Sequence, residues 1–337
     1  MNEHSQLACS PKLTERAITT VDGVRLAVRD QNPRYPTATV VLLHGLCLSQ
    51  ESWSLQVRHL TQRWGPRIRM ITYDHRGHGS STCAPISTYT IGRLADDLTA
   101  VITTLDVRPP LTLVAHSMGG MAALAYLCRP AVQRPVDPSG LVLVATAARK
   151  LSQRGLGRLL STPAIAALAH VAAHTPEHIL HGLVAPLCVT LAPIRGHLPA
   201  ATIAATALTA LTTTATSTAI GYLPSLRSYD IYPALPAIRA RTVIISGGVD
   251  PLTPPQHAHE LAAAIPNALH LHVPTAGHML PQQVPNVVNH AIEHAAGLPP
   301  KPKKASASRI SRSTIRPNPP GPARRQPPVG AQLPGVG

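Results

Sequence analysis

A serine in a glycine-rich turn is the clearest candidate for chemistry in this chain. Residues 115–120 read Ala-His-Ser-Met-Gly-Gly, directly after an apolar run and directly before a helical pattern. A serine on so sharp a strand-to-helix turn is forced outward, and its neighbours must be small, as Gly119 and Gly120 are. The motif G-x-S-x-G usually has glycine where this chain has Ala115, a change of one methyl group that we expect to be tolerated. Taken alone, the pattern also fits an ordinary serine at a helix N-terminus.

Two further polar residues could complete a proton-transfer chain with this serine. Asp250 follows an apolar run at 242–246, and His278 comes shortly after a second run at 269–273. Both therefore fall at the carboxyl ends of expected strands, in the chain order Ser, Asp, His. In such a triad the imidazole removes the serine proton as the hydroxyl attacks a carbonyl, while the carboxylate fixes the imidazole tautomer. Ser117, Asp250 and His278 are our candidate catalytic residues.

A second glycine turn could supply hydrogen-bond donors to the same site. An apolar run at 40–43 leads into His44-Gly45-Leu46, so this turn also falls at the carboxyl end of an expected strand. The negative oxygen of a tetrahedral intermediate needs two N–H donors aimed at it. We expect these donors to be the backbone N–H groups of Leu46 and Met118.

The elements that must position these residues follow an alternating pattern. Short β-rich runs alternate with stretches whose apolar residues recur every three or four positions, as in an open parallel sheet with helices on both faces. Strands are expected at 17–20, 25–30, 39–43, 68–73, 111–115, 141–145, 242–246 and 269–273. Helices are expected at 50–63, 91–105, 119–128, 256–265 and 284–294. The predicted fold class is α/β, with a mostly parallel eight-stranded sheet.

One connection is far longer than a single crossover helix requires. Residues 149–241 separate two consecutive strands, and we interpret them as a helical cap inserted into a core of residues 17–148 and 242–297. A membrane-spanning helix at 201–220 is the competing interpretation. Eight of those twenty residues are Thr, which makes the segment too polar for a convincing span. We therefore favour a cap whose apolar side faces a pocket.

A group of histidines in the predicted cap has two interpretations. Its members lie at near-helical spacing and are His170, His174, His178 and His181. They could form a metal site or a proton relay, but Pro176 interrupts the register and Glu177 is the only carboxylate beside them. We favour histidines that line a pocket, and we expect neither a metal nor a cofactor.

The composition and the ends of the chain narrow the functional class. Residues 1–16 read as a polar lead without a secretory signal, and five scattered cysteines form no C-x-x-C pair, so a cytoplasmic location is expected. The formal charge is +15, but eight Lys or Arg residues lie in 298–337, a Pro-rich segment that we expect to be a disordered tail. This tail could bind an anionic membrane surface or nucleic acid nonspecifically. Aromatic residues make up 3% of the chain and Phe is absent, which disfavours base stacking on the folded body.

A last motif carries a family resemblance. Residues 74–81 read Asp-His-Arg-Gly-His-Gly-Ser-Ser, similar to the D-x-R-G-x-G-x-S loop of the α/β-hydrolase family. Together with the serine turn and its partners, this loop makes residues 17–297 resemble the serine-nucleophile, esterase- and lipase-like branch of that family.

The resemblance also implies roles for residues outside the triad. The loop is structural in the family, which assigns that role to Asp74, Arg76, Gly77 and Gly79 and leaves the positions of His75 and His78 free. A metal site at these two histidines is therefore disfavoured. Gln283 stands where relatives often have Glu, and we infer only a lost surface contact. The segment 149–241 lies where the family carries its lid.

The activity that the resemblance implies is hydrolysis of a small-molecule ester through an acyl-enzyme. A lipophilic acyl group is expected, because the cap between 162 and 223 is dominated by Ala, Leu, Ile and Thr. Serine at 117 argues against the dehalogenase and epoxide-hydrolase branches, which use a carboxylate nucleophile. Relatives with the same triad act as haloperoxidases, lactonases, C–C bond hydrolases or acyltransferases, and these activities stay open. A non-catalytic binding protein docked by its basic tail is the alternative from another class.

Overall fold

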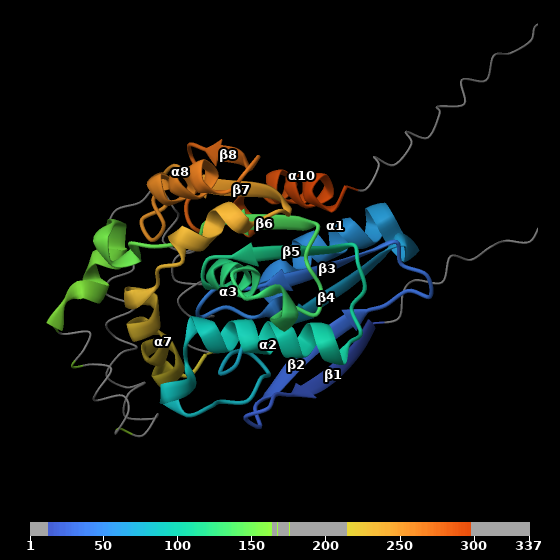
Figure 1. Ribbon diagram of the computed structural model, residues 1–337, viewed down its shortest axis with the longest axis horizontal. Helices are drawn as coiled ribbons and strands as arrows, with labels where there is room; N and C mark the ends of the chain where they lie inside the picture. Colours follow the sequence, from blue (N-terminus) through green and yellow to red (C-terminus); the bar gives the residue numbers. More distant parts are fainter. Residues whose placement is uncertain (1–12, 164–166, 168–174, 176–213, 298–337) are drawn as a thin grey trace, which may run out of the picture. The chain divides into compact units, whose positions relative to one another are not determined.

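The computed structural model describes residues 13–163, 167, 175 and 214–297, and its centre is one sheet (Figure 1). The strands lie in the order β1-β2-β4-β3-β5-β6-β7-β8, with β1 and β2 antiparallel to their neighbours and the rest parallel. The strands are β1 (Leu13–Thr19), β2 (Arg25–Gln31), β3 (Ala38–Leu43), β4 (Ile68–Tyr73), β5 (Leu111–His116), β6 (Gly140–Val144), β7 (Arg241–Gly247) and β8 (Leu269–Val273). The predicted mostly parallel, eight-stranded α/β fold is confirmed.

Helices cover both faces of this sheet. Helices α2, α3 and α8 pack on one face and α1 and α10 on the other (Figure 1). The α-helices are α1 (Ser54–Trp64), α2 (Ile91–Thr104), α3 (Met118–Leu127), α7 (Thr216–Ser228), α8 (Pro255–Ala264), α9 (Leu280–Gln283) and α10 (Pro285–Ala296). Short 3-10 helices span Gln50–Trp53, Gly65–Arg67, Ile86–Thr88, Ala131–Gln133, Leu151–Gln153, Gly155–Ser161 and Tyr232–Ala237.

The central strands are apolar on both sides because both sides face helices. Every residue of β3 is buried. Val41 and Leu43 face the core formed with α2 and α3, whereas Val40 and Leu42 face the core formed with α1 and α10. This two-sided burial explains why the strands read as continuous apolar runs rather than as alternating patterns.

The structure departs from the expected boundaries at two elements. Strand β1 begins at Leu13 rather than at 17, because its backbone pairs with β2 as far as Leu13 opposite Gln31. This pairing needs no apolar side chains, so the sequence pattern did not reveal it, and the predicted lead of residues 1–16 was too long. The stretch predicted as one helix at 50–63 divides into the 3-10 helix Gln50–Trp53 and α1.

Several predictions concern residues that the structure does not describe. They are the cap apart from its two flanks, its four histidines, most of the N-terminal lead and the tail. The flanks are two 3-10 helices within 151–161 and the segment 214–241 with α7. Among the described residues, no helix has both the length and the apolar character needed to cross a membrane.

The loop after β4 is held by a buried charge network. Arg76 is 1% exposed and donates two hydrogen bonds to Asp97 (2.8 and 2.6 Å) and two to Asp22 (2.8 and 3.2 Å). Asp74 accepts hydrogen bonds from the backbone N–H groups of Gln50 (2.7 Å) and Ser80 (2.9 Å). These bonds tie the loop to α2, to the β1–β2 hairpin and to the turn before α1.

Buried histidines fix the turns that follow β3 and β4. The His75 N–H donates to Nε2 of His44 (3.0 Å), whose Nδ1 lies 2.7 Å from the carbonyl oxygen of Gly45. The Cys47 N–H donates to Nε2 of His78 (3.2 Å), and Nδ1 of His78 donates to a backbone carbonyl (3.0 Å). In His44 and His78 one nitrogen must accept and the other must donate, which requires neutral imidazole. Burial accordingly lowers the pKa of His44 to about 4 and that of His78 to about 3.

Removing the arginine at the centre of the charge network should destabilise the fold severely. Arg76→Met leaves Asp97, whose side chain is fully buried, without its charged partner. We expect a loss of about 3–5 kcal/mol in the free energy of unfolding, measured with urea, and partial recovery in Arg76→Met/Asp97→Asn. Arg108→Met, which breaks an exposed pair with Asp106, is the control and should change little. Equal effects of the two single variants would contradict this account of the loop.

Acid should unfold the protein through its buried histidines. In the unfolded chain their pKa returns to about 6.5, so the unfolded state binds protons first as the pH falls below that value. The stability that depends on neutral His44 and His78 is complete above about pH 6.5 and is lost progressively towards about pH 4, by roughly 1 kcal/mol per pH unit for each ring. Thermal unfolding should therefore have a markedly lower midpoint at about pH 5 than at about pH 7.5.

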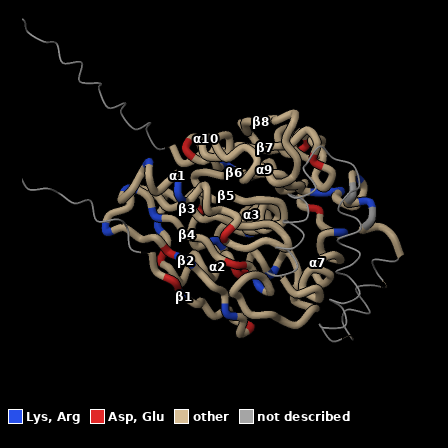
Figure 2. Tube along the Cα trace, turned by 180° about the vertical axis from the view of Figure 1, so that it is seen from behind, with Lys and Arg blue, Asp and Glu red and all other residues tan. Residues whose placement is uncertain are grey.

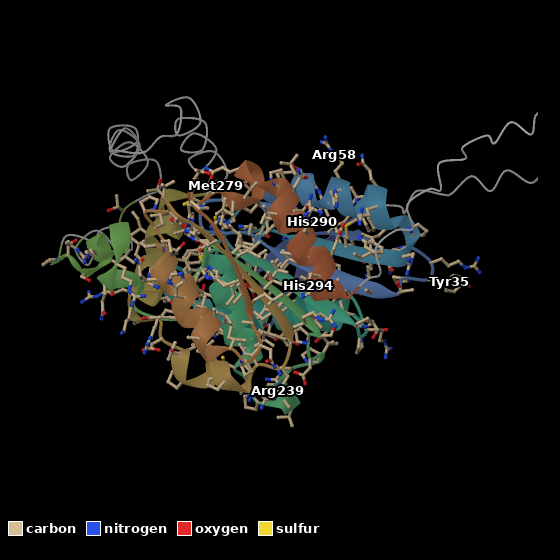
Figure 3. All side chains as sticks on the ribbon, turned by 90° about the horizontal axis from the view of Figure 1, so that it is seen from above. Tyr35, Arg58, Arg239, Met279, His290 and His294 are labelled. Atoms are coloured by element: carbon tan, nitrogen blue, oxygen red, sulfur yellow. The ribbon has the colours of Figure 1, made fainter. Side chains whose placement is uncertain are left out.

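One substitution separates this mechanism from general acid denaturation. His78→Gln keeps an acceptor for the Cys47 N–H but has no titrating ring, so its midpoint should fall less with pH. His290→Gln changes an exposed residue of α10 (Figure 3) and should retain the wild-type pH dependence. A wild-type midpoint that is the same at both pH values would be incompatible with this account.

Candidate active site

Ser117 lies in a strained turn between β5 and α3. Its φ of 51° is in the left-handed region, which residues with a side chain rarely adopt. Two hydrogen bonds hold the turn: the Ser117 N–H donates to the Val144 carbonyl (2.9 Å), and Thr146 Oγ1 donates to the Ser117 carbonyl (2.7 Å). Neither β5 nor α3 carries a Lys, Arg, Asp or Glu residue (Figure 2). The backbone around the serine is therefore set by packing and hydrogen bonds, without charges.

The two glycines after the serine are required by close packing. A Cβ on Gly119 would come within 2.6 Å of the Leu43 carbonyl oxygen and 2.5 Å of the His44 carbonyl oxygen. A Cβ on Gly120 would come within 2.6 Å of Thr146 Oγ1. The start of α3 therefore lies directly against the end of β3, as the small residues of the motif predict.

The structure brings the three candidate catalytic residues together. Ser117 Oγ lies 3.0 Å from Nε2 of His278, and Nδ1 of His278 lies 2.8 Å from Oδ2 of Asp250. Because a carboxylate can only accept, Nδ1 of His278 carries the proton, and Nε2 is free to accept the serine hydroxyl proton. The three side chains thus form one directed chain of hydrogen bonds across 161 residues of sequence.

The carboxylate of Asp250 is held and kept ionised by its surroundings. Its Oδ1 accepts from the N–H groups of Leu252 (2.8 Å) and Thr253 (3.0 Å), and its Oδ2 accepts from Oγ1 of Thr253 (2.7 Å). Burial acts to raise the pKa of Asp250, but the facing His278 and the hydrogen bonds outweigh it, and the pKa lies below its usual value. Our sequence analysis missed Thr253, because a Thr three residues after an Asp does not by itself indicate that it donates hydrogen bonds to that carboxylate.

The loop that carries His278 is fixed by close backbone contacts and by one side chain. Any side chain on Gly247 would collide with the carbonyl oxygens of Ala276 and Gly277. Oε1 of Gln283 accepts a hydrogen bond from the Gly277 N–H (2.7 Å). Our expectation that Gln283 marks only a lost surface contact is therefore wrong. An amide oxygen can accept from a backbone N–H as a carboxylate does, so this residue holds the loop next to His278.

The glycine turn after β3 lies beside the serine. A Cβ on Gly45 would stand 3.1 Å from Cβ of Ser117 and 3.0 Å from Nδ1 of His116. Among the described residues, neither the Leu46 N–H nor the Met118 N–H has a hydrogen-bond acceptor, and both residues line the cavity at Ser117. The histidines beneath the turn hold it at Gly45 and Cys47. The two residues whose N–H groups are predicted as an oxyanion hole therefore both lie at the cavity beside Ser117.

A cavity of about 360 Å³ opens at Ser117 and His278. Its walls come from the core and from both described flanks of the predicted cap, and they include Met118, Met121, Leu151, Leu160, Leu223, Leu226, Leu252 and Met279. Met279 directly follows His278 and is labelled in Figure 3. Among the described lining residues, the titratable side chains are those of Cys47, His116 and His278, and none is Asp, Glu, Lys or Arg. A separate cavity of about 420 Å³ beside α1 contains none of the three candidate residues.

The remaining motif residues lie outside the reacting geometry. Asp74 and Arg76 contact other loops of the core, and any side chain on Gly79 would collide with the Asp74 carboxylate. His75 uses its Nε2, and His78 uses both ring nitrogens, to bond backbone groups. The loop 74–81 therefore holds the turn after β3 in place through hydrogen bonds to His44 and Cys47.

Comparison with known proteins agrees with this architecture. A family model described as the alpha/beta hydrolase fold matches residues 38–281. RutD of Caulobacter vibrioides, named as a carbamate hydrolase, is 28% identical over 276 residues, which cover 82% of this chain and 96% of RutD. EphD of Mycobacterium tuberculosis, named as an oxidoreductase, is 42% identical over 117 residues, 34% of this chain but only 19% of EphD.

Solved structures with the same fold include two esterases. The esterase from Exiguobacterium antarcticum has a TM-score of 0.66 at 23% identity and is covered over 100% of its length by 84% of this chain. A thermophilic esterase from Thermogutta terrifontis has a TM-score of 0.64 at 26% identity, with 83% of this chain and 97% of the esterase covered. The match of the family model over most of the chain shows that this protein belongs to the α/β hydrolase fold family.

Proposed function

We propose that this protein is a serine hydrolase that cleaves carboxylic esters with a neutral, lipophilic acyl group. The observation that carries the proposal is the unbroken chain from Ser117 Oγ through His278 to Asp250, with distances of 3.0 and 2.8 Å. The Ser117 end of this hydrogen-bonded chain lies in an apolar cavity large enough for a small ester. A nucleophile within reach of a base, with the base oriented by a third group, is the arrangement that acyl transfer requires.

The reaction proceeds through an acyl-enzyme. His278 Nε2 takes the proton of Ser117 as its oxygen attacks the ester carbonyl, and the resulting oxyanion accepts hydrogen bonds from the N–H groups of Leu46 and Met118. The imidazolium then protonates the leaving alcohol as the bond to it breaks. A water molecule then gives a proton to the same imidazole as its oxygen attacks the acyl group. The bond to Ser117 Oγ breaks, the imidazolium returns the proton to Oγ, and the carboxylic acid leaves.

Asp250 contributes through position and charge. Its Oδ2 fixes the His278 tautomer with the proton on Nδ1, and its negative charge stabilises the imidazolium that forms in the transition state. The hydrogen bonds donated by the N–H groups of Leu252 and Thr253 keep that carboxylate oriented, and the carboxylate does not itself take the proton.

The lining of the cavity supports the choice of substrate. A charged substrate would lose its hydration there, and the described lining residues include no Asp, Glu, Lys or Arg to pair with it, which is costly. An acyl chain against Met121, Leu223 and Leu226 gains about 0.8 kcal/mol for each methylene that it buries. The similar proteins include one named as a carbamate hydrolase and several named as esterases, and both names refer to cleavage of an acyl bond. Between these two substrate classes, the apolar lining favours esters with aliphatic chains.

Covalent labelling tests the nucleophile. A fluorophosphonate probe reacts with activated serine hydroxyls and should label Ser117, as shown by mass spectrometry of the labelled peptide. Labelling should vanish in Ser117→Ala and fall severely in His278→Ala, while Ser52→Ala, which changes a serine outside the cavity, is the control. If the folded wild-type protein takes no label and turns over no activated ester, the hydrolase proposal fails, and the non-catalytic alternative replaces it.

Turnover of graded esters tests the acyl preference. With p-nitrophenyl esters, kcat/KM should rise from acetyl to butyryl and hexanoyl, by up to about fourfold for each buried methylene. Leu223→Trp narrows the cavity and should reduce hexanoyl turnover more than acetyl turnover, whereas Leu55→Trp at an exposed position of α1 should leave the ratio unchanged. A wild-type enzyme that prefers acetyl to both longer esters would exclude a lipophilic acyl site.

A further inference from the structure

His116 lies between the elements that carry the candidate catalytic groups. It is the last residue of β5 and directly precedes Ser117, yet its side chain is turned inward and the residue is 2% exposed. Its Nε2 lies 2.9 Å from the backbone carbonyl oxygen of His278, and the two rings are 4.9 Å apart between centroids. Gly45 packs against its Nδ1. One imidazole therefore contacts three segments. They are the turn at Ser117 (the nucleophile turn), the loop after β8 that carries His278 (the base loop) and the turn after β3 at Gly45 (the predicted oxyanion turn).

The hydrogen bond to His278 fixes the protonation of the His116 ring. A carbonyl oxygen can only accept, so Nε2 of His116 carries a proton and donates it. Burial lowers the pKa of His116 to about 3, and the charge of the facing His278 acts in the same direction. The ring stays neutral while His278 gains and loses its proton. It is thus a fixed donor that does not compete for the proton of the reaction.

This bond links two segments that are 162 residues apart in the sequence. On its other side, the base loop is held by Gln283 through the N–H of Gly277. The two bonds hold the peptide groups on either side of the Gly277–His278 peptide, one through the Gly277 N–H and one through the His278 carbonyl. With both in place, the His278 backbone cannot shift relative to Ser117 without breaking a buried hydrogen bond.

We propose that His116 is a positioning residue that holds the base loop on the nucleophile turn, and so sets the distance from Ser117 Oγ to His278 Nε2. This inference rests on the proposed function, because the distance matters only if the proton is transferred along it. A displacement of about 1 Å between reacting groups can cost about 100-fold in rate. His278 must also reach the leaving group without moving away from Asp250, so the loop has to be held during the whole cycle.

The chemistry of the bond suggests a matched set of variants. Glutamine places its Nε2 the same number of bonds from Cβ as histidine does, so His116→Gln can still donate to the His278 carbonyl. Leucine has a similar bulk but no donor, and asparagine has a donor that is one bond too short. His290→Leu on the exposed surface of α10 is the control for replacing a histidine by leucine.

Steady-state turnover of p-nitrophenyl butyrate by the full chain tests the proposal. We expect kcat to fall by about 10- to 100-fold in His116→Leu and His116→Asn, with KM within about twofold of wild type. His116→Gln should recover kcat to within about threefold, and fluorophosphonate labelling of Ser117 should slow and recover in parallel. In proton NMR, the downfield Nδ1–H signal of His278 should be present in wild type and His116→Gln and broadened in His116→Leu.

The outcomes distinguish this proposal from the one on which it rests. If wild type labels at Ser117 but folded His116→Leu keeps wild-type kcat, the positioning role is wrong and the hydrolase proposal stands. Recovery that is no better in His116→Gln than in His116→Asn also overturns it, and this comparison remains decisive if His116→Leu does not fold. If wild type neither labels nor turns over the ester, both proposals fail together.

Discussion

Ser117 keeps a backbone conformation that a residue with a side chain rarely adopts, and the packing around it holds it there. Such a conformation costs about 1–3 kcal/mol and persists only when the surroundings determine it. Here β5 lies between β3 and β6 with every residue buried, and α3 starts directly against the end of β3 because Gly119 has no side chain. The same geometry turns the hydroxyl away from the sheet and towards His278. Strain at one residue and exposure of its oxygen therefore have one cause.

Among the described residues at the site, the charge that faces His278 is that of Asp250. His44, His78 and His116 are buried and neutral, so Asp250 supplies the negative charge. A charge separated from water acts more strongly on its neighbour than the same charge on the surface. The buried Arg76 network ties the loop after β4 to α2 and to the β1–β2 hairpin. It makes no contact with the triad among the described residues.

The chain order and the carboxyl ends of the strands were enough to predict that Ser117, Asp250 and His278 lie together, because parallel strands bring their ends to one edge of the sheet. What could not be predicted were the residues that act on backbone groups far away in the sequence. Gln283 and His116 hold the base loop through an N–H and a carbonyl, and no residue type or spacing indicates such partners. The start of β1 at Leu13 was missed for a similar reason, since main-chain pairing extends it without an apolar pattern.

A crystal structure of the protein after reaction with a fluorophosphonate tests the central claim most directly, since the phosphonyl group imitates the tetrahedral intermediate. We predict a bond from phosphorus to Ser117 Oγ, with the phosphoryl oxygen accepting hydrogen bonds from the N–H groups of Leu46 and Met118. We also expect His278 to remain between the adduct and Asp250. An adduct on another residue, or a phosphoryl oxygen that points away from both N–H groups, would contradict the account.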